Sequence, residues 1–119
     1  MKLIIGASFM AISLEFKRAI AAAAITRLSA GSRNLYTAAT WVSEQVGDSL
    51  YTNHKGRSKA TLLLDYRKKI LAAAKGKAGP PKIAVARYHY EQCLNWVSAA
   101  GLKPEESARL LIQTMLERH

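Results

Sequence analysis

The sequence predicts an all-α protein, a single compact bundle of four to five helices that occupies residues 1–119. Apolar residues recur every three or four positions through most of the chain, which is the spacing of one helix face. Residues that favour helix ends stand between these segments, and only 3 prolines and 7 glycines interrupt the chain. With half of its residues hydrophobic, a chain of this length can bury the core of one ordinary domain.

The first helix is predicted in the alanine-rich stretch that precedes Gly31 and Ser32. Its expected buried stripe is Phe9, Ile12, Phe16, Ile20 and Ala24. The small side chains from Ala21 to Ala24 allow close helix packing, either within the protein's own core or against another subunit. A homo-oligomer or a protein partner contacted through this first helix is therefore one expectation.

Three charged residues, Glu15, Lys17 and Arg18, separate the two uncharged runs of this N-terminal stretch. A membrane span needs about 20 apolar residues without such an interruption, and a secretory signal needs a smooth transition to its cleavage region. We therefore expect no membrane anchor. The single cysteine, Cys93, has no partner for an internal disulfide, which favours an intracellular and cytoplasmic protein.

Four further helices are predicted over residues 34–46, 59–74, 83–100 and 104–117. Asn34 and Ser58 are the expected N-caps, and Gly101 is expected to end the fourth helix. Expected buried residues of the second and third helices are Leu35, Ala38 or Ala39, Val42, Val46, Leu62, Leu63, Tyr66, Ile70, Ala73 and Ala74. Those of the fourth and fifth helices are Ile83, Ala86, Tyr90, Cys93 or Leu94, Val97, Ala108, Leu111 and Met115.

The net charge of +10 is concentrated in one region of the chain. Between residues 51 and 87 there are ten basic residues and one acidic residue, Asp65. Such a segment repels itself, and an anionic partner would relieve that repulsion. The simpler alternative is a solvated surface that keeps the protein soluble.

We expect this region to contact nucleic acid or another anionic macromolecule. Two glycine-containing loops, 54–59 and 75–82, flank the third helix, and lysine and arginine in this arrangement neutralise backbone phosphates. Tyr51 and Tyr88 are the tyrosines free to stack on bases, because Tyr66 and Tyr90 have core positions. The predicted nucleic-acid-binding residues are Lys55, Arg57, Lys59, Arg67, Lys68, Lys75, Lys77, Lys82 and Arg87.

Two other partners remain open at this point. The protein could be a structural or adaptor subunit of a larger assembly, with its basic loops against acidic protein surfaces. It could also attach to anionic lipid through the first helix and its Lys17–Arg18 pair. The segment from residue 83 to 117 has the outline of a helix-turn-helix, but the acidic start of its second helix favours an ordinary helical hairpin.

We expect a non-catalytic protein with no cofactor and no metal. His89 and Cys93 lie four residues apart and share a helix face, but no third group is evident to orient them as a nucleophilic pair. As metal ligands they would need two more donors. Nucleotide-binding and zinc-protease motifs are absent from the sequence.

Overall fold

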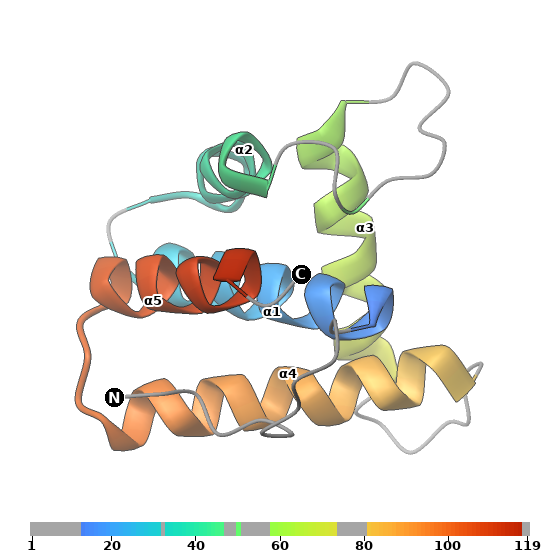
Figure 1. Cartoon of the computed structure of the whole chain (residues 1–119). Coiled ribbons are helices and arrows are strands. Elements are labelled where there is room, and N and C mark those ends of the chain that lie inside the picture. The colour runs from blue at the N-terminus through green and yellow to red at the C-terminus, as the bar shows by residue number, and fades with distance from the viewer. Residues whose placement is uncertain (1–12, 32, 47–49, 51–57, 74–80, 118–119) are drawn as a thin grey trace.

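The computed structural model describes residues 13–31, 33–46, 50, 58–73 and 81–117. These residues form five α-helices and no strand, as the sequence predicts (Figure 1). The helices are α1 (Leu14–Ser29), α2 (Leu35–Val46), α3 (Lys59–Ala72), α4 (Pro81–Ala99) and α5 (Pro104–Glu117).

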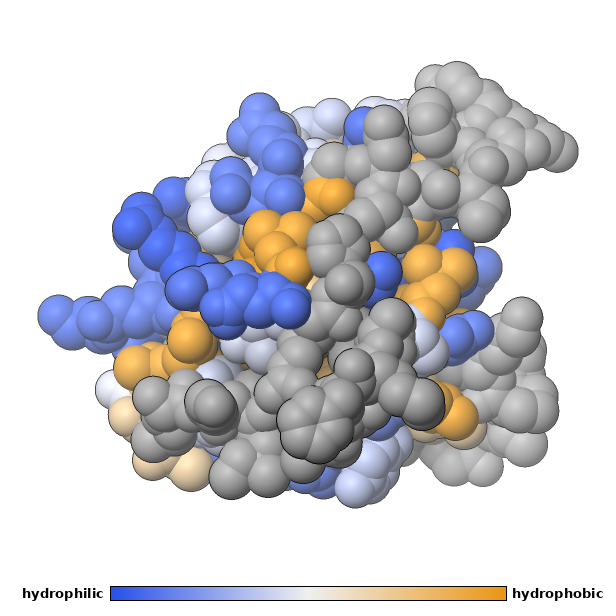
Figure 2. Space-filling view, viewed as in Figure 1, coloured by the Kyte–Doolittle hydropathy of each residue, from blue (hydrophilic) through white to orange (hydrophobic). Residues whose placement is uncertain are grey.

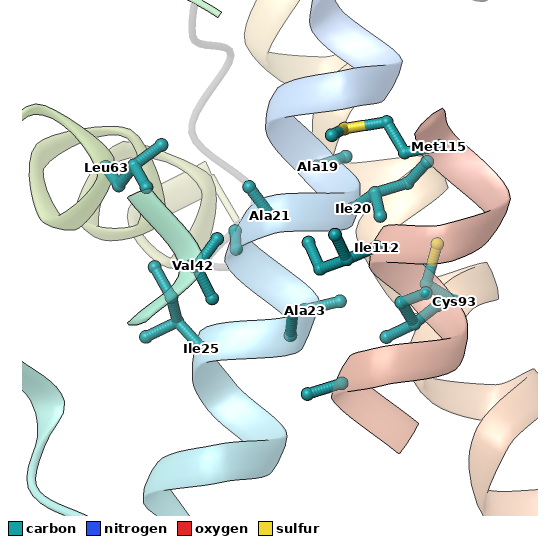
Figure 3. Packing of buried hydrophobic residues seen from close by; sticks show 14 of the residues in the cluster. Ala19, Ile20, Ala21, Ala23, Ile25, Val42, Leu63, Cys93, Ile112 and Met115 are labelled. Atoms are coloured by element: carbon teal, nitrogen blue, oxygen red, sulfur yellow. The ribbon is translucent and has the colours of Figure 1, made fainter. Parts of the chain in front are cut away.

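Helix α1 is the centre of the fold, and each of the other four helices packs against it. All seven residues from Ala19 to Ile25 are at most 1% exposed, so α1 is buried around its whole circumference along this stretch. Figure 3 shows Ala21 and Ile25 facing Val42 and Leu63 on one side, while Ala19 and Ile20 lie near Ile112 and Met115 on another. The predicted single stripe is therefore too narrow. Phe9 and Ile12 of that stripe lie outside the described residues.

The alanines of α1 explain how four helices fit around one. An alanine adds almost no volume beyond the backbone, so neighbouring helices approach the α1 axis closely and bury their own larger side chains against it. The alanine-rich surface thus serves the protein's own core, and it is not available to a partner. Helices α4 and α5 pack against α1 more extensively than α2 and α3 do.

N-cap side chains form hydrogen bonds at the start of three of the described helices. Ser58 Oγ accepts a hydrogen bond from the Thr61 amide at 3.1 Å, and Asn34 Oδ1 accepts one from the Thr37 amide at 2.8 Å. These bonds satisfy amides that have no partner within the helix. Both N-caps are confirmed. Ser13 caps α1 in the same way through the Phe16 amide, at 3.1 Å.

Helix α4 begins two residues earlier than predicted, at Pro81, because proline is well suited to the first position of a helix. The helix ends at Ala99, and Gly101 terminates it as predicted. Gly101 has φ of +68°, a conformation that favours glycine, and its amide bonds to the Ser98 carbonyl while the Leu102 amide bonds to the Val97 carbonyl. This reversal sends the chain directly into α5.

Helices α4 and α5 do not form the hairpin that the sequence suggested. Within the described residues they are not among the packed helix pairs, and each packs on α1 instead. Arg27 of α1 fastens the turn between them, because its Nη2 donates to the Leu102 carbonyl at 3.0 Å. The arrangement also lacks the mutual packing of two helices on which a helix-turn-helix depends.

Most predicted core residues are buried, but Leu62 and Ala73 are only half-buried and Ala74 lies outside the described residues. Leu35 is 40% exposed at the start of α2, whereas Ala38 and Ala39 are both fully buried. Ile83 and Leu94 of α4 are half-buried at the edges of its buried face. Tyr66, predicted to be in the core, is also only half-buried, and the Arg18 guanidinium lies over its ring.

Candidate nucleic-acid interface

The nine predicted binding residues divide into three groups. Four of them lie outside the described residues: Lys55, Arg57, Lys75 and Lys77. Lys82 lies in the first turn of α4 rather than in a loop, and its side chain is outside the described part. The described residues that remain are Lys59, Arg67, Lys68 and Arg87, of which the first three lie on α3 and the last on α4.

Arg67 takes part in a polar network that joins three helices. Its Nε donates to Thr26 Oγ1 of α1 at 3.0 Å, and that hydroxyl lies 2.8 Å from the hydroxyl oxygen of Tyr90 on α4. Tyr90 is 3% exposed, so its hydroxyl depends on this contact for a hydrogen-bond partner. Arg67 itself is half-buried. The network fixes the guanidinium group where α1, α3 and α4 meet.

Arg87 lies against the same tyrosine. Its guanidinium carbon is 5.5 Å from the centre of the Tyr90 ring, within the range of a cation–π contact. Its Nη2 also pairs with Glu91 Oε2 one turn along α4, at 3.2 Å. Tyr90 therefore contacts Arg87 directly and is linked to Arg67 through Thr26, whereas in the sequence the two arginines share only a basic segment.

A second tyrosine, Tyr66 of α3, contacts two further cations. The Arg18 guanidinium lies 3.9 Å from the centre of the Tyr66 ring, and Lys69 Nζ lies 5.8 Å from it. Arg18 also donates from Nη2 to the Leu50 carbonyl at 3.3 Å. The i, i+3 spacing of Tyr66 and Lys69 was a sequence signal for the second contact. No local signal indicates the first, because Arg18 is 48 residues away from Tyr66.

We use the name basic junction for five cations of α1, α3 and α4, of which four make the contacts described above and the fifth, Lys68, lies between Arg67 and Lys69 on α3. They are Arg18, Arg67, Lys68, Lys69 and Arg87. Lys68 and Lys69 are exposed, and the three arginines are partly exposed. Helix α3 carries four basic residues and only one acidic residue, Asp65, so its local potential is positive.

The aromatic residues of α4 lie beside this site. Tyr88 is 60% exposed, and its ring meets the edge of His89 with ring centres 5.5 Å apart. His89 in turn stacks on Phe16 of α1 at 4.1 Å between ring centres. Desolvation lowers the pKa of His89, and its buried Nδ1 has no hydrogen-bond partner in the described part of the chain.

The geometry around Cys93 opposes nucleophilic chemistry. The thiol is completely buried, and this burial raises its pKa to about 12. At neutral pH the thiol is therefore protonated, whereas nucleophilic attack requires the thiolate. The described residues also contain no group of three or more histidine, cysteine or acidic side chains arranged to hold a metal ion.

Among the described helices, none has the length and apolar character needed to cross a membrane. Comparison with known proteins found no matching family model, no similar curated protein and no solved structure with a matching fold. The case for a function therefore depends on the residues themselves.

Proposed function

We propose that this protein binds nucleic acid through its phosphate backbone, with the basic junction as the centre of the interface. The observation that carries the proposal is a set of contacts that hold arginines of three helices: Arg18 lies over Tyr66, Arg67 bonds to Thr26 beside the Tyr90 hydroxyl, and Arg87 lies over the Tyr90 ring. These arginines are separated by up to 69 positions in the sequence. A merely solubilising surface does not need to bring such residues together.

The fixed positions of the arginines support binding rather than general solubility. A free arginine loses considerable side-chain entropy when it orders on a ligand. Arg18 and Arg67 are already held, one over an aromatic ring and one by a hydrogen bond, so less of that entropy remains to be lost. Arginine also donates to phosphate in a planar, two-pronged geometry.

The opposite ends of α3 lead into the other basic residues of the predicted site. Lys55 and Arg57 precede α3 in the chain, and Lys75 and Lys77 follow it. The 14 residues of α3 span about 21 Å at 1.5 Å per residue. Over that length a nucleic-acid backbone offers several phosphates, so α3 and its flanking segments can contact a strand at more than one point.

Tyr88 gives the interface a candidate for base stacking. It is the most exposed of the large apolar and aromatic side chains that the structure describes, and it follows Arg87 directly in α4. An exposed aromatic ring beside a cationic surface is typical of proteins that bind unpaired strands, because every base has a flat face. We therefore propose a preference for single strands over duplexes.

A salt titration tests this function. Protein purified in high salt and treated with nuclease is mixed with fluorescein-labelled 20-nucleotide single-stranded and duplex DNA, and with single-stranded RNA. Anisotropy is measured from 50 to 300 mM salt. The proposal predicts a linear fall of log K with log salt, with a slope of about −0.7 for each phosphate neutralised on a single strand.

The same titration decides whether the alternative function, assembly with another protein, needs to be tested. Binding that is absent at 50 mM salt for all three probes, or that does not change with salt, would rule out the proposed function. Light scattering of the nuclease-treated protein with an acidic polypeptide would then test a protein partner, as expected for an adaptor subunit.

A further inference from the structure

Helices α2 and α5 enclose a surface groove, with a volume of about 520 Å³, that is distant in sequence and composition from the basic junction. Trp41 of α2 lines one side, and Leu116 of α5 lines the other together with Ile112, which is only 3% exposed. Leu116 is 41% exposed. Figure 2 shows hydrophobic side chains between the positions of α2 and α5, bordered by hydrophilic ones.

The groove follows a second face of α5. The first face, which includes Ala108, Leu111, Ile112 and Met115, is buried in the core. The second face carries Arg109, Gln113, Leu116 and Glu117, which are spaced three or four residues from Gln113 and so form a continuous stripe along the helix. All four residues of this stripe are exposed, and Leu116 is its apolar member.

The polar residues of this stripe have a symmetric order. Arg109 and Glu117 stand four residues before and four residues after Gln113, so they lie about 6 Å from it along the helix axis in opposite directions. Both charged side chains are exposed, and neither forms an ion pair with another described residue. One end of the stripe is positive, the other is negative, and its centre is an amide that can both donate and accept a hydrogen bond.

We propose that α5 pairs in antiparallel orientation with α5 of a second copy of this chain, about a two-fold axis at Gln113. In that pairing Arg109 of each copy meets Glu117 of the other, and the two Gln113 amides meet at the axis. The same operation lays each α5 against the opening of the other copy's groove, beside Trp41, and covers both Leu116 side chains. A two-fold interface requires a surface that complements itself in this way, and an unrelated partner does not.

Charge reversal tests this dimer directly. Sedimentation equilibrium is measured on nuclease-treated protein from 1 to 100 µM in 150 mM salt. Arg109→Glu places two pairs of carboxylates together, and Glu117→Arg places two pairs of guanidinium groups together. We expect each to weaken dimerisation by about tenfold or more, because two attractive pairs become repulsive. The double variant R109E/E117R restores both pairs with reversed polarity, so it should recover the wild-type dissociation constant within about threefold.

Lys103→Glu provides the matched control, since it reverses one exposed charge outside the groove and should leave dimerisation unchanged. Circular dichroism verifies the fold of each variant. Should a charge reversal impair folding, Gln113→Glu introduces the same repulsion at the axis with a side chain of equal size. A wild-type protein that is monomeric at 100 µM would overturn the proposal. So would single reversals that remain dimeric, or a folded double variant that stays monomeric.

Discussion

The hydroxyl oxygens of Thr26 and Tyr90 lie 2.8 Å apart and join the central helix α1 to α4. Arg67 of α3 donates to the same Thr26 hydroxyl, so one small polar side chain connects three helices in a mainly apolar region. The contact has two consequences. It satisfies a nearly buried tyrosine, and it fixes an arginine at the edge of the protein where the proposed nucleic-acid interface lies.

Replacing Thr26 with valine should destabilise the protein by about 1–3 kcal/mol, because the variant leaves the Tyr90 hydroxyl and Arg67 Nε without their partner. Valine keeps the shape of threonine, so the loss reports the hydroxyl alone. Urea denaturation measures the free energy of unfolding. Thr40→Val is the control. The Thr40 hydroxyl donates to the Tyr36 carbonyl within the same helix, so removing this hydroxyl should cost under about 0.5 kcal/mol. Equal effects of the two substitutions would show that the three-helix network does not contribute to the free energy of unfolding.

Ala22→Leu should destabilise the fold by about 1–3 kcal/mol or more, because Ala22 is 1% exposed and no space exists for three further carbon atoms. The matched substitution Ala84→Leu adds the same atoms at an exposed position of α4 and should change the free energy of unfolding by no more than about 0.5 kcal/mol. Thermal unfolding monitored by circular dichroism distinguishes the two. A fold that tolerates leucine at position 22 would mean that α1 is not enclosed as described.

The stability of the protein should fall as the pH drops below about 6.5, in part because of His89. Burial lowers the pKa of His89 in the folded state, so the unfolded chain binds a proton that the folded chain does not. His89→Phe keeps a ring that can stack on Phe16 and removes the titration. The free energy of unfolding of this variant should therefore fall less than that of the wild type between pH 7.5 and pH 5.5. Parallel curves for the two proteins would exclude a contribution from His89.

Cys93 should react very slowly with a thiol reagent in the native protein. A pKa of about 12 leaves roughly one thiolate in ten thousand thiols at pH 8, and the side chain is also buried. In an absorbance assay with a disulfide reagent, little of the reagent's coloured thiolate should be released over minutes in native buffer. In 6 M guanidinium its release should be complete within the mixing time. Rapid reaction under native conditions would show that α4 opens readily at this position.

Local residue patterns determine the fold class, and the sequence predicts it well for that reason. N-capping by Asn34 and Ser58 and chain reversal at Gly101 are decided within a few residues, so they can be identified without knowledge of the tertiary structure. The complete burial of the middle of α1 had one available sign, the uninterrupted apolar run from residue 19 to 25. A single buried stripe does not account for the four helices that pack around this run.

The candidate site could be predicted only in part. The basic segment and the exposure of Tyr88 follow from composition and helical spacing. Arg18 is not among the predicted binding residues, because nothing near it in the sequence indicates that its partner is Tyr66 on α3. The partner of Arg67, Thr26, is 41 residues away. Contacts of this kind depend on how α1 crosses α3, which periodicity does not specify.

The most direct test of the proposed interface compares two charge-reversal doubles that change the net charge equally. Lys68→Glu with Lys69→Glu reverses the two exposed lysines of the basic junction. Lys17→Glu with Lys103→Glu reverses two cations outside it, and Lys17 is rotated by about 100° from Arg18 around α1. Both doubles are measured for affinity to the single-stranded DNA probe from 50 to 300 mM salt, with helicity verified by circular dichroism.

We predict that the Lys68–Lys69 double loses affinity at least about tenfold at 100 mM salt and that its salt dependence becomes shallower by about one to two units, as expected for lost phosphate contacts. The Lys17–Lys103 double should retain the wild-type salt slope. Equal losses in the two folded variants would mean that only total charge matters. That result would contradict the assignment of nucleic-acid binding to the meeting point of α1, α3 and α4.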